Sequence, residues 1–201
     1  MSLSTREKLV RSAYELFCKF GFHAAGLDQI IKKAGVTKGT FYNHFESKDA
    51  LILAVLEWRD ASWPDNLRDT LRKHAGENPC DQLLAFVDFL DEIWGTEKYH
   101  GCLFLRAAAE FPMLHDPIHI VVHQFVGAVG TALRELASYA GAKDPDTLAR
   151  ELLVVIAGAY ANSQMGDPCK AVETGKRLAK RILTEALKPT RTNAKAKKKR
   201  R

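Results

Sequence analysis

The segment that decides the fold reads "GVTKGTFYNHFESKDAL" and covers residues 35–51. Phe41 and Phe45 lie four residues apart, so on a helix they share one face and can anchor it to a core. A helix that served only the core would not also carry Lys, Thr, Tyr, Asn and His side chains on its other sides. The segment therefore predicts a short helix that its rings hold in place while its polar groups face outward.

The residues before this helix complete a helix-turn-helix. The stretch "LDQIIKKA", residues 27–34, predicts a short helix with both isoleucines turned inward, and "GVT" follows it. Gly35 can adopt a left-handed conformation, and Val36 can fill the corner. Thr37 can then cap the second helix, "KGTFYNHF", at residues 38–45. Two helices joined by a tight turn with glycine form a motif whose second helix enters the major groove of DNA with its N-terminus first.

The outward side of the second helix suits DNA. Gly39 has no side chain, so the helix can lie close to DNA, and Thr37 and Thr40 place hydroxyls near the positive end of the helix, where phosphate binds. Ser47 is predicted to cap the following helix, whose first turn holds a lysine for another phosphate. The predicted DNA-binding residues are Thr37, Lys38, Gly39, Thr40, Tyr42, Asn43, His44 and Lys48. The alternative is a packed helical corner with no role in DNA binding.

Helix signals continue along the rest of the chain, and strand signals are scarce. Ser4 and Glu7 form a capping box ahead of an apolar helical face, and Gly21 is predicted to end that helix with a left-handed cap. Four later helices start with Asn or Asp before a proline, which suits the first helical position because the N–H there has no partner. A long helix opens at Ser47, and Pro64 should bend or interrupt it. The other helices are predicted near 79–95, 101–111, 117–140, 145–164 and 168–187, which gives an all-α fold of about nine helices.

The composition is that of a globular protein with basic ends. Of the 201 residues, 46% are hydrophobic and 27% are charged, and the formal net charge is +6. Residues 1–50 carry eight basic and five acidic side chains, and residues 188–201 carry eight basic and no acidic ones, so the body between them is net acidic. Basic ends favour a polyanionic partner such as nucleic acid.

Several classes of protein are excluded. The longest apolar run, "LLVVIAGAYA" at 152–161, is about half of the ~20 residues that a membrane span needs, and the start "MSLSTREK" predicts no signal peptide. The four cysteines form no CxxC pair, so they fit neither a disulfide framework nor a zinc finger and indicate a reduced, cytoplasmic protein. No Ser/His/Asp or Cys/His set, phosphate loop or HExxH motif appears, so we expect neither an enzyme nor a cofactor.

On these residues the chain resembles the TetR family of transcriptional regulators. The matching pieces are "LFCKFGF", "DQIIKKAGVTKGTFYNHF" and "ESKDAL", all within residues 4–51, and the helix count fits the family's architecture. The resemblance implies a ligand-binding C-terminal domain, a homodimer through the last two helices, and repression that a small molecule relieves. We therefore expect a three-helix DNA-binding domain over 1–46 and a helical ligand-binding and dimerisation domain over 47–187. Residues 188–201 should be a disordered basic tail, because they lack apolar side chains to bury.

The resemblance also implies roles on the DNA. It places Lys38 and Thr40 where family members read bases. The positions that it implies for phosphate contacts are Tyr42, His44 and Lys48. The sequence departs from the family at Ala25 and Gly26, where Thr or Ser commonly caps the second helix and touches phosphate. Glycine can still cap a helix, but the hydroxyl contact is lost.

Small and branched residues along the last two predicted helices suggest a two-fold bundle. They are Leu148, Leu152, Ile156 and Ala159 in 145–164, and Ala171, Leu178, Ile182 and Ala186 in 168–187. Two such helices from each of two copies would form a four-helix bundle and pair two DNA-binding heads. The alternative is that these faces pack only inside one chain.

A ligand pocket is expected among the helices from 79 to 125. Arg106 and Glu110 lie four residues apart on an otherwise apolar helix, so either they pair with each other or they orient a polar ligand. Aromatic residues could line the walls, although several could be plain core instead. They are Phe86, Phe89, Trp94, Phe104, Phe125 and Tyr160.

Cysteine and histidine residues near this pocket have two readings each. Cys102 follows a glycine, as in TetR-family members that sense electrophiles or oxidants through a cysteine there. Such a sensor needs an accessible thiol of low pKa, and the alternative is a small buried side chain. His119 and His123, which follow His115 at intervals of four, remain pocket candidates. Their spacing can chelate a metal, but without a carboxylate or cysteine partner we expect no metal site.

The predicted function is a dimeric DNA-binding repressor that a small molecule releases from a palindromic operator. Its expected partners are double-stranded DNA, an effector of unknown identity and a second copy of the chain, with no membrane. The runner-up is a redox or electrophile sensor on the same scaffold, in which serine at position 102 would abolish thiol-dependent release. A third reading is an architectural DNA binder driven by the basic tail, which could equally serve only solubility.

Overall fold

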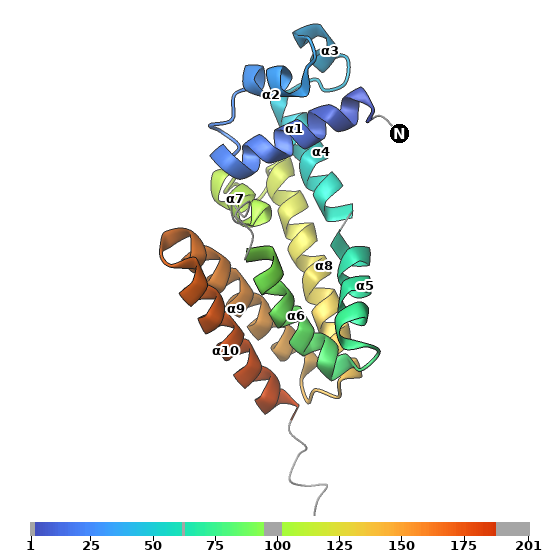
Figure 1. Cartoon of the computed structure of the whole chain (residues 1–201), viewed down its shortest axis with the longest axis vertical. Coiled ribbons are helices and arrows are strands. Elements are labelled where there is room, and N and C mark those ends of the chain that lie inside the picture. The colour runs from blue at the N-terminus through green and yellow to red at the C-terminus, as the bar shows by residue number, and fades with distance from the viewer. Residues whose placement is uncertain (1–2, 62, 95–101, 188–201) are drawn as a thin grey trace, which may run out of the picture. The chain divides into compact units, whose positions relative to one another are not determined.

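The computed structural model describes residues 3–61, 63–94 and 102–187. Over these ranges the chain forms ten α-helices and no strand, so the predicted all-α class is confirmed (Figure 1). The helices are α1 (Thr5–Phe20), α2 (Leu27–Ala34), α3 (Lys38–Tyr42), α4 (Lys48–Ala61), α5 (Trp63–Ala75), α6 (Pro79–Trp94), α7 (Leu103–Glu110), α8 (Pro117–Tyr139), α9 (Pro145–Met165) and α10 (Pro168–Ala186).

The chain divides into two compact units. Unit 1 comprises residues 1–70 and 94–129, and unit 2 comprises residues 71–93 and 130–201. In unit 1 one apolar core joins residues of α1 to α4 with residues of α7 and the start of α8. Gly101 and the predicted tail, 188–201, lie outside the described residues.

The start of α1 follows the sequence signals, and its end departs from them. The Glu7 N–H donates to Ser4 Oγ at 3.2 Å and the Ser4 N–H donates to Glu7 Oε2 at 2.8 Å, which confirms the capping box. Gly21 ends the helix with φ 90° and ψ 171°. Its φ is positive, as a left-handed cap requires, but its ψ is extended, so the predicted left-handed cap is wrong in detail.

The predicted helix-turn-helix is present in unit 1. Gly35 adopts the left-handed conformation, with φ 69° and ψ 34°, and the side chain of Thr37 accepts the Thr40 N–H at the start of α3. Phe41 and Phe45 are both buried in the core of the unit, with ring centroids 5.9 Å apart. The second helix is shorter than predicted, since regular helix ends at Tyr42 and turns continue to His44.

The long helix predicted from Ser47 is described as two helices, because residue 62 between them lies outside the described residues. This is why ten helices are described rather than about nine. The described part of α4 ends at Ala61, and that of α5 begins at Trp63, one residue before Pro64. The predicted bend or interruption at Pro64 therefore stays a prediction.

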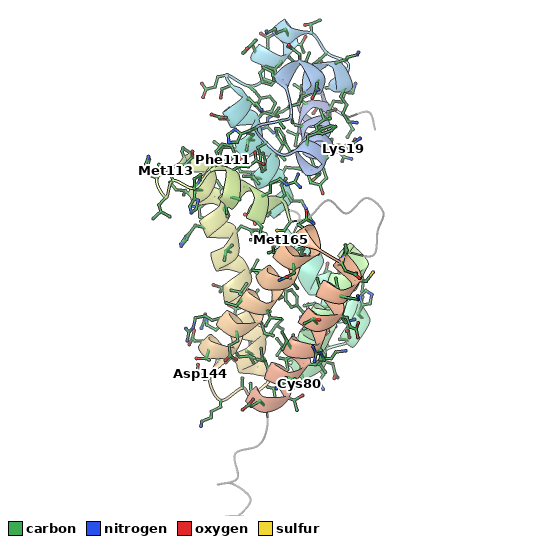
Figure 2. All side chains as sticks on the ribbon, turned by 90° about the vertical axis from the view of Figure 1, so that its left-hand side faces the viewer. Lys19, Cys80, Phe111, Met113, Asp144 and Met165 are labelled. Carbon is green, nitrogen blue, oxygen red and sulfur yellow. The ribbon has the colours of Figure 1, made fainter. Side chains whose placement is uncertain are left out.

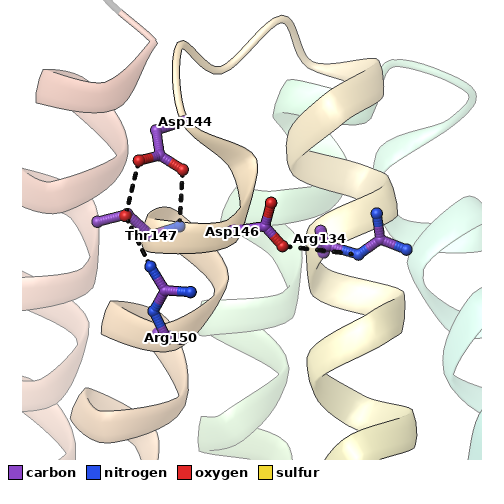
Figure 3. Close-up of polar contacts among 5 residues, drawn as sticks. All are labelled: Arg134, Asp144, Asp146, Thr147 and Arg150. Carbon is purple, nitrogen blue, oxygen red and sulfur yellow. Dashed lines mark hydrogen bonds and ion pairs between the residues drawn. The ribbon is translucent and has the colours of Figure 1, made fainter.

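Unit 2 contains the predicted capping of the last two helices. Asp144 accepts the Thr147 N–H at 3.0 Å and the Thr147 hydroxyl at 2.8 Å, and Arg134 of α8 forms an ion pair with Asp146 at 3.9 Å (Figure 3). The carboxylate of Asp167 likewise accepts the Lys170 N–H at the start of α10. Both acid–proline starts are therefore confirmed as helix caps.

Helices α9 and α10 pack closely, and Gly175 is the point of contact. Gly175 is buried in α10, and a Cβ atom there would lie 2.8 Å from the Cβ of Ala159 in α9. Neither atom belongs to a flexible side chain, so only a shift of one helix could relieve the clash.

We expect Gly175→Ala to lower the free energy of unfolding by about 1–3 kcal/mol, as overpacked cores do, despite a gain of about 0.5–1 kcal/mol in helix propensity. Urea denaturation followed by circular dichroism measures the loss. Adding Ala159→Gly removes the opposing methyl group and should restore part of the stability. If Gly175→Ala alone is as stable as the wild type, the close contact between α9 and α10 does not limit stability.

Candidate nucleic-acid interface

Helix α3 keeps its apolar and polar sides separate. Phe41 is fully buried, whereas Tyr42 is 51% exposed and packs its ring edge-on against Phe41, with centroids 5.2 Å apart. The predicted DNA-binding residues Thr37, Lys38, Asn43 and His44 are also exposed, and Thr40 is half-buried. The segment therefore presents the predicted polar residues to solvent from a backbone that the two phenylalanines hold.

Two threonine hydroxyls define the start of α3. Thr37 Oγ1 accepts the Thr40 N–H at 3.1 Å and lies 2.8 Å from Thr40 Oγ1, with which it shares a hydrogen bond. This arrangement fixes the side-chain positions of both residues. Each hydroxyl oxygen also has a further lone pair, because a hydroxyl offers two acceptor sites and one donor.

Gly39 is exposed, and nothing among the described residues requires glycine there. Its φ is not positive, and a Cβ built on it would meet only Thr37 Oγ1, at an ordinary 3.9 Å. Glycine inside a helix costs about 0.5–1 kcal/mol relative to alanine. Glycine at this position therefore costs helix stability without relieving a contact within the described residues.

The Lys48 ammonium is held at the start of α4. Its Nζ donates to the backbone carbonyl of His23, in the connection between α1 and α2, at 3.2 Å. Burial lowers the pKa of Lys48, while the carboxylates of Asp49 and Glu110 act in the opposite direction. An ammonium has three donors, so two remain for a phosphate.

The sequence predicts either that Arg106 and Glu110 pair with each other or that they contact a ligand. Instead, Arg106 binds the backbone at the end of α1, and Glu110 binds the backbone that follows α1. Arg106 Nη1 donates to the carbonyls of Phe17 and Cys18 at 3.0 and 2.8 Å. Glu110 accepts the N–H groups of Phe22 and His23 at 3.0 and 2.7 Å. Sequence reasoning missed this role, because their partners are almost 90 residues away, at separations of 87 to 89.

The remaining pocket candidates do not gain a ligand role from their contacts. His119 Nδ1 bonds the carbonyl of Phe111 at 2.8 Å, and the rings of Phe104 and Phe125 stack with centroids 3.6 Å apart. Phe86 is buried, Tyr160 is half-buried and His123 is exposed. The side chains of Phe89 and Trp94 lie outside the described part of the structure. Ligand binding by any of these residues stays a prediction.

The environment of Cys102 does not favour a reactive thiolate. Cys102 is the residue before α7, and burial raises the pKa of its thiol, although backbone N–H groups of Leu105 and Phe104 act in the opposite direction. A sensor cysteine has the reverse property, a lowered pKa.

No group of three His, Cys, Asp or Glu side chains among the described residues is arranged to hold a metal ion. Over the same residues, no helix combines the length and apolar character that crossing a bilayer requires.

Comparison with known proteins identifies the family. Residues 9–55 match the model of the bacterial regulatory proteins of the tetR family. The transcriptional repressor NemR of Escherichia coli K12 is 35% identical over 107 residues, 53% of either chain. The chain thus spans about half the length of this curated relative.

Solved structures extend the likeness to nearly the whole chain. The TetR-family regulator SCO4454 of Streptomyces coelicolor matches with a TM-score of 0.82 and 28% identity, over 92% of this chain and 96% of that one. A Streptomyces avermitilis protein described as a TetR-type regulator matches with a TM-score of 0.73 and 30% identity, over 90% and 98%. These relatives are transcriptional regulators and not enzymes, as expected for this chain. The chain belongs to the TetR family of bacterial transcriptional regulators.

Proposed function

We propose that this protein is a repressor that binds a palindromic operator as a homodimer and leaves it when a small molecule binds. The observation that carries the proposal is the division of α3 into a buried aromatic side and an exposed polar side. Its relatives include the repressor NemR and the activator FasR, so the direction of regulation is part of the proposal.

The proposed DNA contacts lie on α3, in the turn after it and at the start of α4. Lys38 and Thr40 are proposed to read bases, because their side chains stand on the first turn of the helix that enters the major groove. The residues proposed to hold or approach the backbone are Thr37, Gly39, Tyr42, Asn43, His44 and Lys48. Phosphate contacts position the protein without specifying sequence.

We propose that α9 and α10 pair with the same helices of a second copy, through other α9 residues than those predicted. Leu148, Leu152, Ile156 and Ala159 are all buried within the single chain. The exposed face of α9 instead carries Val154, Gly158, Ala161 and Met165, and Val154 is 72% exposed. Met165, at the end of the helix, is 76% exposed (Figure 2). The spacing of these α9 residues is four, three and four, which forms one helical stripe.

On α10 the predicted residues fit a second copy better. The buried stripe of this helix is Val172, Gly175, Ala179 and Leu183. The predicted residues Ala171, Leu178, Ile182 and Ala186 lie beside it and are half-buried or exposed. They are thus available to a symmetric four-helix bundle.

The segments proposed from the sequence serve this function. Residues 1–46 would bind DNA, residues 47–187 would bind the effector and the second copy, and residues 188–201 would add affinity for any DNA through phosphate neutralisation. The protein would act in the cytoplasm, where its DNA lies. Release by an effector is proposed ahead of release by oxidation of Cys102, since burial raises the pKa of that thiol.

Footprinting on the DNA upstream of the protein's own gene and its neighbours tests the proposal. We expect wild type to protect a palindromic site at moderate salt, and Tyr42→Ala to lose it, because the exposed ring and hydroxyl touch the DNA backbone. The matched control is Tyr139→Ala, at the exposed end of α8, which should bind like wild type.

Weak, uniform binding that survives Tyr42→Ala but disappears when residues 188–201 are deleted would contradict the repressor. It would identify a non-specific DNA binder. Protection of a site whose occupancy raises transcription of the neighbouring gene would instead leave a regulator of the opposite sign.

A further inference from the structure

We infer that Glu110, on α7, is a positioning residue for DNA binding, which holds the backbone that in turn holds the Lys48 ammonium. This inference rests on the proposed function. It assigns the residue to the DNA-binding surface although it lies outside both the predicted DNA-binding domain and the matched segment, residues 9–55.

The Glu110 carboxylate binds two consecutive backbone N–H groups. Oε1 accepts from Phe22 at 3.0 Å and Oε2 accepts from His23 at 2.7 Å. The backbone carbonyl of Glu110 lies 3.1 Å from His23 Nε2, and the His23 ring packs on Phe111, with centroids 4.9 Å apart. The backbone N–H and the imidazole ring of His23 are therefore both held by Glu110, at the end of α7, and by Phe111, which follows it.

The approach of the carboxylate depends on Gly21. A Cβ at Gly21 would lie 2.7 Å from Glu110 Oε1, and the positive φ of this residue already favours glycine. Arg106, one turn before Glu110, donates to the carbonyls of Phe17 and Cys18 at the end of α1. Arg106 and Glu110 of α7 thus provide hydrogen-bond partners for backbone carbonyl and N–H groups at the end of α1 and just after it.

His23 passes this restraint to the DNA-binding surface. Its carbonyl oxygen accepts the Lys48 ammonium at 3.2 Å, and Lys48 stands on the first turn of α4, next to the segment that carries α3. With one N–H of the ammonium tied to His23, the other two point in fixed directions. Lys48 can then meet a phosphate without first losing the rotamer freedom of a long side chain.

The test is Glu110→Gln in the full-length protein, with binding to the operator measured by fluorescence anisotropy over a series of salt concentrations. The amide can accept only one of the two N–H groups, and its own NH₂ opposes the other. We expect affinity on the order of tenfold weaker and a salt dependence whose slope falls by about 1 for each subunit, since the Lys48 phosphate contact is lost. Partial unfolding would lower the active fraction at every salt concentration and leave the slope unchanged.

Two further variants make the assignment specific. In a Lys48→Met background, Glu110→Gln should cost less than about twofold, because coupled residues are not additive. Asp144→Asn makes the same acid-to-amide change at the cap of α9 and should leave both affinity and slope unchanged.

Each other result overturns the inference. If Glu110→Gln leaves the slope unchanged, or weakens binding as much in the Lys48→Met background as in the wild-type background, Glu110 does not act through Lys48. A wild type that protects no site would overturn the proposed function and this inference together, whereas a wild type that binds while Glu110→Gln behaves like Asp144→Asn would overturn the inference alone.

Discussion

Phe41→Ala should lower the free energy of unfolding of the DNA-binding segment by about 3–5 kcal/mol and abolish operator binding. Phe41 is fully buried in the core of unit 1, so alanine there leaves a cavity that the helices around it cannot close completely. Native domains have only about 5–15 kcal/mol of stability, so the loss is a large part of the total.

The loss of DNA binding follows from the length of α3. A helix of five residues, Lys38–Tyr42, is far below the ~12–15 residues at which isolated helices become stable in water, so packing rather than propensity maintains it. Without the Phe41 ring, the residues that face DNA would lose the backbone that positions them.

Thermal and urea denaturation with circular dichroism detection, together with anisotropy of a labelled operator, would measure both effects. Tyr42→Ala is the matched control, since it removes the neighbouring ring from the exposed side. It should cost no more than about 1 kcal/mol, the value of one edge-on aromatic contact, yet still weaken DNA binding. If Phe41→Ala unfolds at the wild-type denaturant concentration, the buried ring does not hold α3.

Gly39→Leu should weaken operator binding by on the order of a hundredfold, which is about 1.4 kcal/mol lost at each of two half-sites. A leucine side chain would project from the exposed side of α3 and keep the helix away from the groove. The free energy of unfolding should stay the same or rise by about 0.5–1 kcal/mol, because glycine is a poor helix former.

The control is Gly127→Leu, on an exposed stretch of α8 where a Cβ meets nothing within 4 Å. That variant should bind the operator like wild type. It would show that a glycine-to-leucine change weakens binding only when it is made on α3. Unchanged operator affinity in Gly39→Leu, measured by anisotropy, would mean that α3 does not approach DNA closely.

Local signals in the sequence predicted most of the helices. The box of Ser4 and Glu7, the left-handed Gly35 and the cap at Asp144 depend on atoms within four residues of each other, so their geometry follows from the chain nearby. The spacing of Phe41 and Phe45 likewise defined which side of α3 is buried, because side chains four apart share a face.

The sequence was less informative where several faces of one helix are apolar, because it did not show which of them is buried. Apolar residues on several sides of α9 fit more than one buried stripe, and the residues actually buried are Leu148, Ala149, Leu152, Ile156, Ala159 and Ser163. Which side faces inward depends on where α10 lies, and that is fixed by the contact of Gly175 with Ala159. Periodicity alone carries no information about the neighbouring helix.

The sequence by itself thus determined the all-α class, the helix-turn-helix, its caps and the family. Only the tertiary structure decided that Arg106 and Glu110 bind the chain at the end of α1, and that His23 links Glu110 to Lys48. The physical reason is distance along the chain. Caps and helix faces are built from neighbouring residues, whereas a carboxylate finds the N–H groups of residues 87 and 88 positions away only after the helices have packed.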